Sequence, residues 1–416
     1  MSALDSVLVI LAVLALLGVI FEEVTHINKA KVTLFFGTLS WILLFLFSGS
    51  ADETSAIATG LTESIAEIAS LWLFLVAAMT FVAYLNKKGM IENLIYLVMP
   101  KQVSERKLLF LTGLFCFIFS SLADNITATL VSCSLILSLN LELRKRLQFI
   151  TLVVFAVNSG GVSLITGDVT TLMIFLAQKV EILTLLTLAV PASLTVFVLA
   201  VFLSRGLTGT VTLHSTRTEI RPVDKFISVL FLSTILFTIA GNALFGIPPV
   251  LTFLFGLSMM FLASQFLSDD SDLDPILDYI RIIEFETLLF FLGILLLVGT
   301  LKEIHALDSF VAIYDVLPPL YANYLMGIIS AVIDNVPLTA ALLKAGIEMS
   351  PGEWMGLTYA VGVGGSLLII GSAAGIVAMS KIEGLTFGAY LRYLAHLLAA
   401  YTLGYAGVYM LGNFIH

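Results

Sequence analysis

Two Asp-Asn pairs lie in the most apolar parts of the sequence. Asp124 and Asn125 stand in SLADNITAT, between LLFLTGLFCFIFS and LVSCSLILSL, and Asp334 and Asn335 stand in AVIDNVPLT. A charged Asp at the centre of a bilayer costs about 2.5–3.5 kcal/mol, so such residues usually face a bundle interior or an aqueous cavity. Carboxylate and carboxamide oxygens in such a place predict a site for a small cation or a proton.

Helix capping is the alternative explanation for these pairs, because Asp and Asn accept hydrogen bonds from the free N–H groups at a helix start. A cap needs only one residue of each pair, and the pair occurs twice. Capping and ion binding can coexist: we expect Asn125 to cap the helix that follows and Asp124 to face the ion. At the second pair, Pro337 would also fit a simple turn before a helix.

The Gly-rich stretch NSGGVSLITGD at 158–168 brings further oxygen ligands into an apolar segment. Asn158 and Asp168 flank it, and Thr166 and Thr170 lie inside it and just beyond it. An unwound helix frees carbonyl and hydroxyl oxygens, which hard cations prefer, and Asp168 adds a negative charge. We therefore expect Asp168 to act with Asp124 at a cation site, with a polar surface loop as the alternative.

A matching stretch, GVGGSLLIIGS at 362–372, keeps the glycines but has no carboxylate. Ser366 and Ser372 are its polar side chains. The two copies therefore share a shape, while the charge is concentrated in the first copy. This asymmetry is expected when one ion site forms near the interface between two repeats.

The elements that position these residues are apolar helices. Of 416 residues, 59% are hydrophobic and 12% charged, whereas soluble domains have about 25% charged residues. Apolar runs long enough to cross a bilayer recur along the chain, which is typical of a polytopic all-α membrane protein. The net charge of −9 argues against nucleic-acid binding. The two cysteines have no metal-ligand spacing.

The chain divides into two repeats joined by a cytoplasmic linker at 204–224. The repeats match at SLADNITAT and AVIDNVPLT, at the two Gly-rich stretches, and at EIASLWLFLV (67–76) and EFETLLFFLG (284–293). The first repeat (1–203) has scaffold helices at 6–85, a re-entrant hairpin at 107–140, a broken helix at 147–178 and a final helix at 181–203. The second repeat (225–416) has the corresponding parts at 225–301, 319–347, 353–380 and 385–411. Each repeat has five crossings, and this odd number predicts inverted topology, as in secondary transporters.

Lys and Arg predict the orientation. They concentrate in the loops at 22–31, 86–107, 141–147 and 204–225, which places these loops in the cytoplasm and both termini in the periplasm. The acidic run SDDSDLD at 268–274 is then cytoplasmic as well. No Lys or Arg falls within the hairpin tips or the Gly-rich breaks. With three Asp residues and no evident basic partner there, we expect the ligand to be a cation.

Four motifs in this order resemble the NhaD-type sodium/proton antiporters of the ion transporter superfamily. They are SSLADNITATL, VNSGGVSLITGDVTTLMI, FETLLFFLGILLLVG and SAVIDNVPLTAAL, and the resemblance covers essentially the whole chain. The family has Asp where this chain has Glu286, and His and Glu where this chain has Glu63 and Ser70. These departures bear on pH sensing and on the third helix of the second repeat rather than on the core site.

The resemblance implies a set of site residues. Those expected to bind the ion are Asp124, Asn125, Asn158, Asp168, Thr170, Asp334, Asn335, Ser366 and Ser372, with Na⁺ at the first four. Those expected to support them are Thr166, Glu286, Thr287, Ser330 and Thr339. The resemblance further implies an elevator carrier with separate scaffold and transport domains in a bacterial inner membrane, commonly dimeric.

The predicted function is secondary active exchange of Na⁺ or Li⁺ for H⁺, which extrudes sodium and needs no further cofactor. Desolvation favours the protonated form of a buried carboxyl, so a proton and a cation compete for the same site. The main alternative is a carrier of the same architecture for arsenite or carboxylates, whose dicarboxylate branch has a Ser-Asn-Thr tip where both tips here have Asp-Asn. An intramembrane aspartyl protease using Asp124 and Asp168, and a passive channel, are further alternatives.

Overall fold

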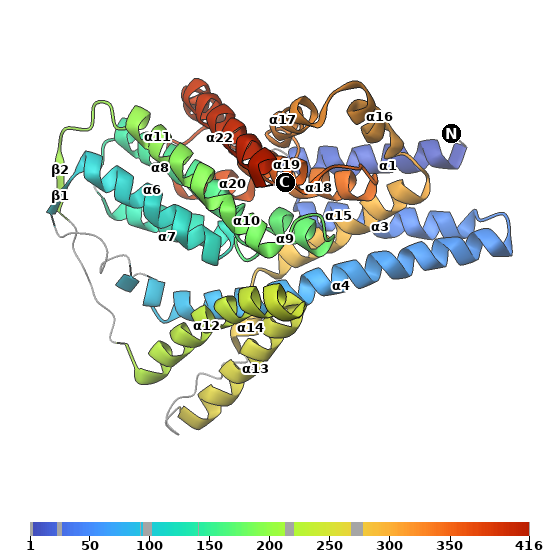
Figure 1. Cartoon of the computed structure of the whole chain (residues 1–416), viewed down its shortest axis with the longest axis horizontal. Coiled ribbons are helices and arrows are strands. Elements are labelled where there is room, and N and C mark those ends of the chain that lie inside the picture. Colours follow the sequence, from blue (N-terminus) through green and yellow to red (C-terminus); the bar gives the residue numbers. More distant parts are fainter. Residues whose placement is uncertain are drawn as a thin grey trace.

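The computed structural model describes residues 3–22, 27–91, 93–94, 102–139, 141–212, 220–267 and 278–415. Within these ranges the chain is almost entirely helical (Figure 1). The acidic run at 268–274 lies outside the described residues. Six of the helices described are long and apolar enough to cross a membrane on their own, namely Lys29–Leu46, Ala51–Lys87, Ile182–Leu203, Pro222–Phe245, Phe285–Glu303 and Leu394–Ile415.

The described part of the first half follows the order expected from its hydropathy. Its helices are α1 (Ala3–Ile20), α3 (Lys29–Leu46), α4 (Ala51–Lys87), α6 (Glu105–Leu122), α7 (Asn125–Ser138), α8 (Leu143–Gly161), α9 (Val169–Leu176), α10 (Ile182–Thr187) and α11 (Ala189–Leu203). The helix expected at 63–85 begins earlier, at Ala51, because Ser50 caps it there by accepting a hydrogen bond from the Glu53 N–H.

In the second half, the helices are α12 (Pro222–Phe245), α13 (Pro249–Leu267), α14 (Asp278–Ile282), α15 (Phe285–Glu303), α16 (Asp308–Val316), α17 (Pro319–Ser330), α18 (Asn335–Lys344), α19 (Pro351–Gly364), α20 (Ala373–Lys381), α21 (Phe387–Leu391) and α22 (Leu394–Ile415). Several features were not expected from the sequence, among them the helix α16 and the division of the segment 181–203 between α10 and α11. The segment 385–411 is divided between α21 and α22, and the segment 204–224 contains a strand, β2 (Thr210–Thr212), that pairs antiparallel with β1 (Gln102–Ser104).

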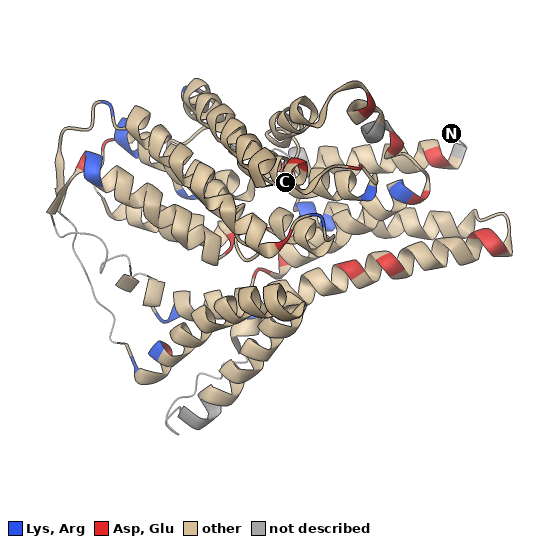
Figure 2. Ribbon diagram, in the orientation of Figure 1, with Lys and Arg blue, Asp and Glu red and all other residues tan. Residues whose placement is uncertain are grey.

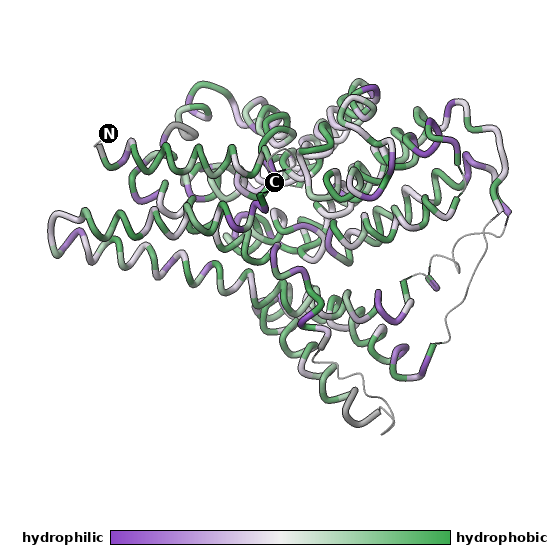
Figure 3. Tube along the Cα trace, turned by 180° about the vertical axis from the view of Figure 1, so that it is seen from behind, coloured by the Kyte–Doolittle hydropathy of each residue, from purple (hydrophilic) through white to green (hydrophobic). Residues whose placement is uncertain are grey.

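The helices pack into two groups that cut across the two repeats of the sequence (Figure 1). One group joins α1, α3 and α4 to α12, α13 and α15; the other joins α6 to α11 with α17 to α22. Hydrophobic residues run along the helices (Figure 3). Large apolar side chains such as those of Phe35 and Phe197 are each 60% exposed. Exposed apolar side chains on helices are what a lipid solvent requires.

Charged residues are sparse along the helices and gather at their ends (Figure 2). Lys and Arg mark the starts of α6, α8 and α12 at one end of the molecule, while the N-terminus lies toward the opposite end (Figure 2). The positive-inside rule predicts such a basic end for the cytoplasmic face of a membrane protein.

Equivalent contacts in the two halves support the repeat. Ser120 donates a hydrogen bond to the Val157 carbonyl at 2.8 Å, and its counterpart Ser330 donates to the Val361 carbonyl at 2.7 Å. A Cβ added to Gly160 would collide with the backbone of Phe117, and one added to Gly364 would collide with the backbone of Gly327. In each half, therefore, the first hairpin helix lies backbone to backbone against the helix that precedes the break.

Candidate functional site

Four helices begin at one small cavity between the two groups of helices. The cavity has a volume of about 90 Å³. The residues that cap α7, α9, α18 and α20 all line it, and each accepts a hydrogen bond from a backbone N–H of the helix it caps. These caps are Asp124, Asp168, Asp334 and Ser372. We call this space the inner cavity. A helix start carries a partial positive charge, so each of the three carboxylates is stabilised where it stands.

Asp168 lies at the centre of this arrangement and is 6% exposed. Its Oδ1 accepts hydrogen bonds from the backbone N–H and the hydroxyl of Thr170, at 2.9 and 3.0 Å. Its Oδ2 accepts hydrogen bonds from the side-chain amides of Asn125, at 3.0 Å, and Asn335, at 3.4 Å. The two asparagines are equivalent residues of the two hairpin tips, so both repeats converge on one carboxylate.

Asn158 extends this network behind the cavity wall. It is fully buried, its amide donates to the Ser372 hydroxyl at 2.9 Å, and its Oδ1 lies 3.5 Å from the amide nitrogen of Asn125. Asn and Gln amides offer both donors and an acceptor oxygen. Asn125 uses both ends of its amide, because its nitrogen donates to Asp168 and its Oδ1 accepts from the Ser120 hydroxyl at 2.7 Å.

The residue of the first Asp-Asn pair that caps the helix is not the one predicted. Asp124, not Asn125, caps α7: its Oδ1 accepts from the Thr127 N–H at 2.9 Å and its Oδ2 from the Thr127 hydroxyl at 2.7 Å. Asn125 is the first residue of α7 and contacts Asp168. The prediction was wrong because the helix begins one residue earlier than assumed, which turns the two side chains to different faces. Asp124 still lines the inner cavity.

A basic residue does reach the hairpin tip, contrary to the prediction. Lys29, assigned from the sequence to a cytoplasmic loop, is the first residue of α3, and its Nζ lies 3.5 Å from Asp334 Oδ2. Lys29 also lines the inner cavity. The prediction considered only basic residues within the tips and breaks, whereas Lys29 comes from a helix 305 positions away in the chain. Asp334 thus has a cationic partner that its counterpart Asp124 does not have among the described residues.

The remaining predicted residues divide by their contacts. Thr166 and Thr287 line the inner cavity, although the Thr166 hydroxyl is bound to the Ser121 carbonyl. Three others donate their hydroxyls to backbone carbonyls and do not line it: Ser330, Thr339 and Ser366. Ser366, which was expected to bind the ion, lies in the break just after α19, and its hydroxyl donates to the Val363 carbonyl in the last turn of that helix. These three hydroxyls use their protons in hydrogen bonds to the backbone.

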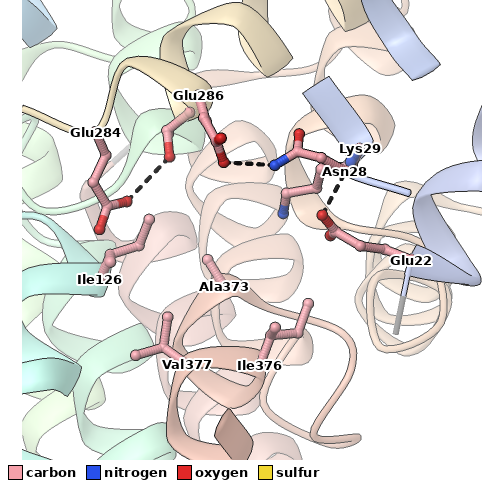
Figure 4. A pocket seen from close by; sticks show the side chains of 10 residues that line it. Glu22, Asn28, Lys29, Ile126, Glu284, Glu286, Ala373, Ile376 and Val377 are labelled. Atoms are coloured by element: carbon pink, nitrogen blue, oxygen red, sulfur yellow. Dashed lines mark hydrogen bonds between the residues drawn. The ribbon is translucent and has the colours of Figure 1, made fainter. Parts of the chain in front are cut away.

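A larger cavity of about 410 Å³ adjoins the inner cavity and shares Lys29, Ile126 and Thr287 with it (Figure 4). We call it the vestibule. Glu286, expected near the site, is exposed here and accepts a hydrogen bond from the Asn28 amide (Figure 4). Glu284 also faces the vestibule and accepts from the Thr287 hydroxyl at 3.2 Å. The vestibule therefore offers carboxylates at the mouth of the inner cavity.

Sequence reasoning missed several residues of this site, and the repeat could have revealed two of them. Ser120, which donates to Asn125 Oδ1 at 2.7 Å, is the counterpart of the predicted Ser330. Glu284 is the first residue of the repeated motif EFETLLFFLG. Asn28 and Lys29 carry no such signal, because they belong to a helix start without a repeat partner among the matched motifs.

Comparison with known proteins agrees with these motifs. A family model described as "Citrate transporter" (CitMHS) matches residues 2–364. The Na⁺/H⁺ antiporter NhaD of Alkalimonas amylolytica is 32% identical, and the alignment covers 96% of this chain and 89% of that protein. NhaD of Vibrio cholerae serotype O1 is 31% identical, with 92% and 87% covered. The sodium/proton antiporter 1 of Arabidopsis thaliana is 29% identical, with 93% and 71% covered.

A solved structure shares the fold. The crystal structure of the YdaH transporter from Alcanivorax borkumensis aligns with a TM-score of 0.54 at 12% identity, and covers 94% of this chain and 98% of that chain. At this identity the likeness concerns the fold alone, and it identifies the chain as an all-α polytopic membrane protein. The resemblance drawn from the sequence motifs is confirmed: this chain belongs to the citrate transporter (CitMHS) family and to the family of NhaD-type Na⁺/H⁺ antiporters.

Proposed function

We propose that this chain is a secondary active antiporter that exchanges Na⁺, or Li⁺, for H⁺ and uses inward proton flow to extrude sodium. The observation that carries the proposal is Asp168, a buried carboxylate held by Asn125 and Asn335 from the two hairpin tips. The relatives named as Na⁺/H⁺ antiporters align over nearly the whole chain, which includes these residues.

In this proposal, Na⁺ and H⁺ compete for the same carboxylate. Asp168 binds the cation, and the side-chain oxygens of Asn125, Asn158, Thr170 and Asn335 complete its coordination as the amides turn. Protonation of Asp168 removes its charge and releases the cation, because a neutral carboxyl in a cavity of low dielectric constant holds Na⁺ poorly. Competition of this kind at one site, combined with alternating access, gives obligatory exchange. Asp124, Asp334 and Ser372 contribute further oxygens to the same cavity.

The two groups of helices are the candidates for the moving and stationary parts. The inner cavity lies between them, since its lining includes α3, α4 and α15 from one group and α7, α9, α18 and α20 from the other. An elevator movement of the second group against the first would carry Asp168 across the membrane. With the orientation predicted from Lys and Arg, the vestibule opens toward the cytoplasm and both termini are periplasmic. We further propose an inner-membrane homodimer.

Transport of a carboxylate is the second candidate, favoured by the description of the matching family as citrate transporters. One feature opposes it. The described residues that line the inner cavity include three carboxylates and one ammonium, which would repel an anion.

Everted membrane vesicles from a strain without other Na⁺/H⁺ antiporters test both candidates. Addition of Na⁺ or Li⁺ should dissipate a respiration-generated pH gradient when the wild-type chain is present. Asp168→Asn should abolish this response at equal protein levels. Asp308→Asn, which changes a carboxylate that is 71% exposed, should leave it intact. Uptake of labelled citrate or arsenite without Na⁺-driven proton release would reject the antiporter in favour of the alternative.

A further inference from the structure

Lys29 occupies the boundary between the vestibule and the inner cavity and lines both (Figure 4). Its Nζ lies 3.5 Å from Asp334 Oδ2 and 4.7 Å from the centroid of the Phe290 ring. The Lys29 side chain is 20% exposed and that of Asp334 is 9% exposed. The ammonium is therefore largely withdrawn from solvent, where its interaction with a carboxylate is screened much less than at a protein surface.

The surrounding residues fix the position of Lys29. Asn28 caps α3 by accepting from the Ala30 N–H at 2.8 Å, and its amide donates to Glu286 at the start of α15. The backbone N–H of Lys29 itself donates to Glu22 Oε1 at 3.0 Å. The stem of Lys29 leaves this anchored helix start toward Phe290, whose ring faces the ammonium. The lysine is thus part of a constructed site rather than a mobile surface side chain.

We propose that Lys29 is a specificity-determining residue of the ion site. Its ammonium serves as a tethered cation that neutralises Asp334 and leaves Asp124 and Asp168 as the two unpaired carboxylates of the inner cavity, with the cation bound at Asp168. This inference rests on the proposed function and adds to it the residue that sets affinity and valence. Among the described residues that line the inner cavity, Lys29 is the one positive charge against three carboxylates.

Charge arithmetic fixes the sign of each expected effect. Removing the ammonium adds one unpaired negative charge, so Na⁺ binds more tightly and Ca²⁺, which prefers several carboxylate oxygens, gains access to the cavity. Removing the Asp334 carboxylate leaves one unpaired positive charge, so Na⁺ binds more weakly. Removing both restores the original balance. A merely structural ion pair would instead give two defects of the same sign.

The test measures the Na⁺ dependence of proton release from proteoliposomes that contain purified protein and a pH-sensitive dye. The variants are Lys29→Met, Asp334→Asn, the double variant, and the charge-conserving Lys29→Arg. Lys302→Met is the matched control, because Lys302 is 43% exposed and pairs with Glu63 outside both cavities. Stabilisation of each protein by Na⁺ in a thermal-unfolding assay reports binding independently of transport.

We expect the KM for Na⁺ to fall at least tenfold in Lys29→Met and to rise at least tenfold in Asp334→Asn, because one unit charge within about 12 Å of the ion contributes at least this factor at an effective dielectric constant of about 20. The double variant, Lys29→Arg and Lys302→Met should stay near the wild-type KM. Ca²⁺ should inhibit Lys29→Met and leave the wild type unaffected. The thermal-unfolding assay should rank the Na⁺ affinities in the same order.

Several results would overturn the proposal: an unchanged or raised KM in Lys29→Met, a double variant no better than Asp334→Asn, or a Lys29→Met protein that ignores Ca²⁺. If Lys29→Met is not recovered folded, Lys29→Gln, which keeps a hydrogen-bond donor beside Asp334, supplies the same sign test. A wild-type protein that releases no protons on addition of Na⁺ would refute the antiporter function itself. A wild type that exchanges normally, with the wrong signs in the variants, would refute only the role of Lys29.

Discussion

The two discontinuous helices of the molecule have the same shape and different charge. α8 and α9 are separated by a Gly-rich break that ends at Asp168, and α19 and α20 by one that ends at Ser372. Both residues cap the helix that follows, and both line the inner cavity. One cap is a carboxylate and the other a hydroxyl. The backbone of the two broken helices is therefore equivalent, but only the first break ends in a charged residue that can hold an ion.

The two hairpin tips show the same principle in another form. Asp124 and Asp334 both cap the second helix of their hairpin, and Asn125 and Asn335 both donate to Asp168. Asp334 is paired with Lys29, whereas Asp124 accepts hydrogen bonds from Thr127 of its own first turn. A symmetric backbone thus carries an asymmetric set of charges.

The strongest test of this asymmetry replaces each of the two capping residues, Asp168 and Ser372, in turn and compares the loss of exchange. Asp168→Asn should abolish Na⁺-dependent proton release, because it removes the charge on which both repeats converge. Ser372→Ala should reduce exchange by about tenfold at most, the value of one neutral hydrogen bond of about 1 kcal/mol. Vesicle assays at matched expression measure both. Equal losses in the two variants would mean that the charge asymmetry is not what defines the site.

Replacing the two asparagines should change the apparent Na⁺ affinity to different extents, because their hydrogen bonds to Asp168 differ in length. Asn125→Ala removes a 3.0 Å bond to Asp168 and Asn335→Ala a 3.4 Å bond. Hydrogen bonds to charged groups contribute about 1.5–3 kcal/mol, so Asn125→Ala should weaken apparent Na⁺ affinity by roughly 10–100-fold and Asn335→Ala by less. The KM for Na⁺ in proteoliposomes measures the difference. A larger effect at Asn335 would contradict the geometry.

The capping role of Asp124 predicts a stability effect that separates it from ion binding. Asp124→Ala removes the cap of α7 and should cost about 1 kcal/mol, whereas Asp124→Asn keeps a capping side chain and should retain the stability. Melting temperatures in detergent, measured without Na⁺, compare the two variants. If Asp124→Asn melts as low as Asp124→Ala, the cap is not what Asp124 contributes to the fold.

The smallest expected difference concerns ion pairs at the ends of the hairpin helices. It is a difference in stability, and it depends on pH. Glu105 at the start of α6 is buried and accepts hydrogen bonds from Lys145 Nζ at 2.7 Å and from the Gly209 N–H at 2.9 Å. Glu67 pairs with Lys344 at the end of α18, and its side chain is 57% exposed. Burial alone would raise the pKa of Glu105, but the Lys145 ammonium and the Gly209 N–H outweigh it and hold the pKa below its ordinary value.

Because the pKa of Glu105 is lower in the folded state, its stabilising contribution is present above its unfolded pKa of about 4.3 and is lost as the pH falls through the folded value. Glu105→Gln should therefore lower the melting temperature at neutral pH, and this difference from wild type should vanish in acid. Glu67→Gln should change it less, since exposed pairs contribute little. A Glu105→Gln deficit that persists at low pH would exclude the ion pair as its cause.

The membrane fold and the repeat could be predicted because they leave local signals. Apolar runs of defined length reflect the thickness of the bilayer. Glycines in the last turn before each break allow close backbone contact between two helices, as at Gly160 and Gly364. Asp124 and Asp168 were recognisable because a carboxylate in an apolar segment is costly and needs a reason. These inferences depend on residues that are neighbours in the chain.

The meeting of side chains from distant helices was decided by the tertiary structure. Asn335 reaches Asp168 across 167 positions, and Lys29 reaches Asp334 from a different group of helices. The one-residue difference in where α7 begins, which made Asp124 the cap and turned Asn125 toward Asp168, was likewise set by packing. The sequence alone determined that carboxylate and amide oxygens lie within the apolar segments of this membrane protein, where they predict a cation site. Which oxygens share one cavity, and which lysine balances them, depends on how the helices pack, because periodicity and composition do not encode the contacts between helices.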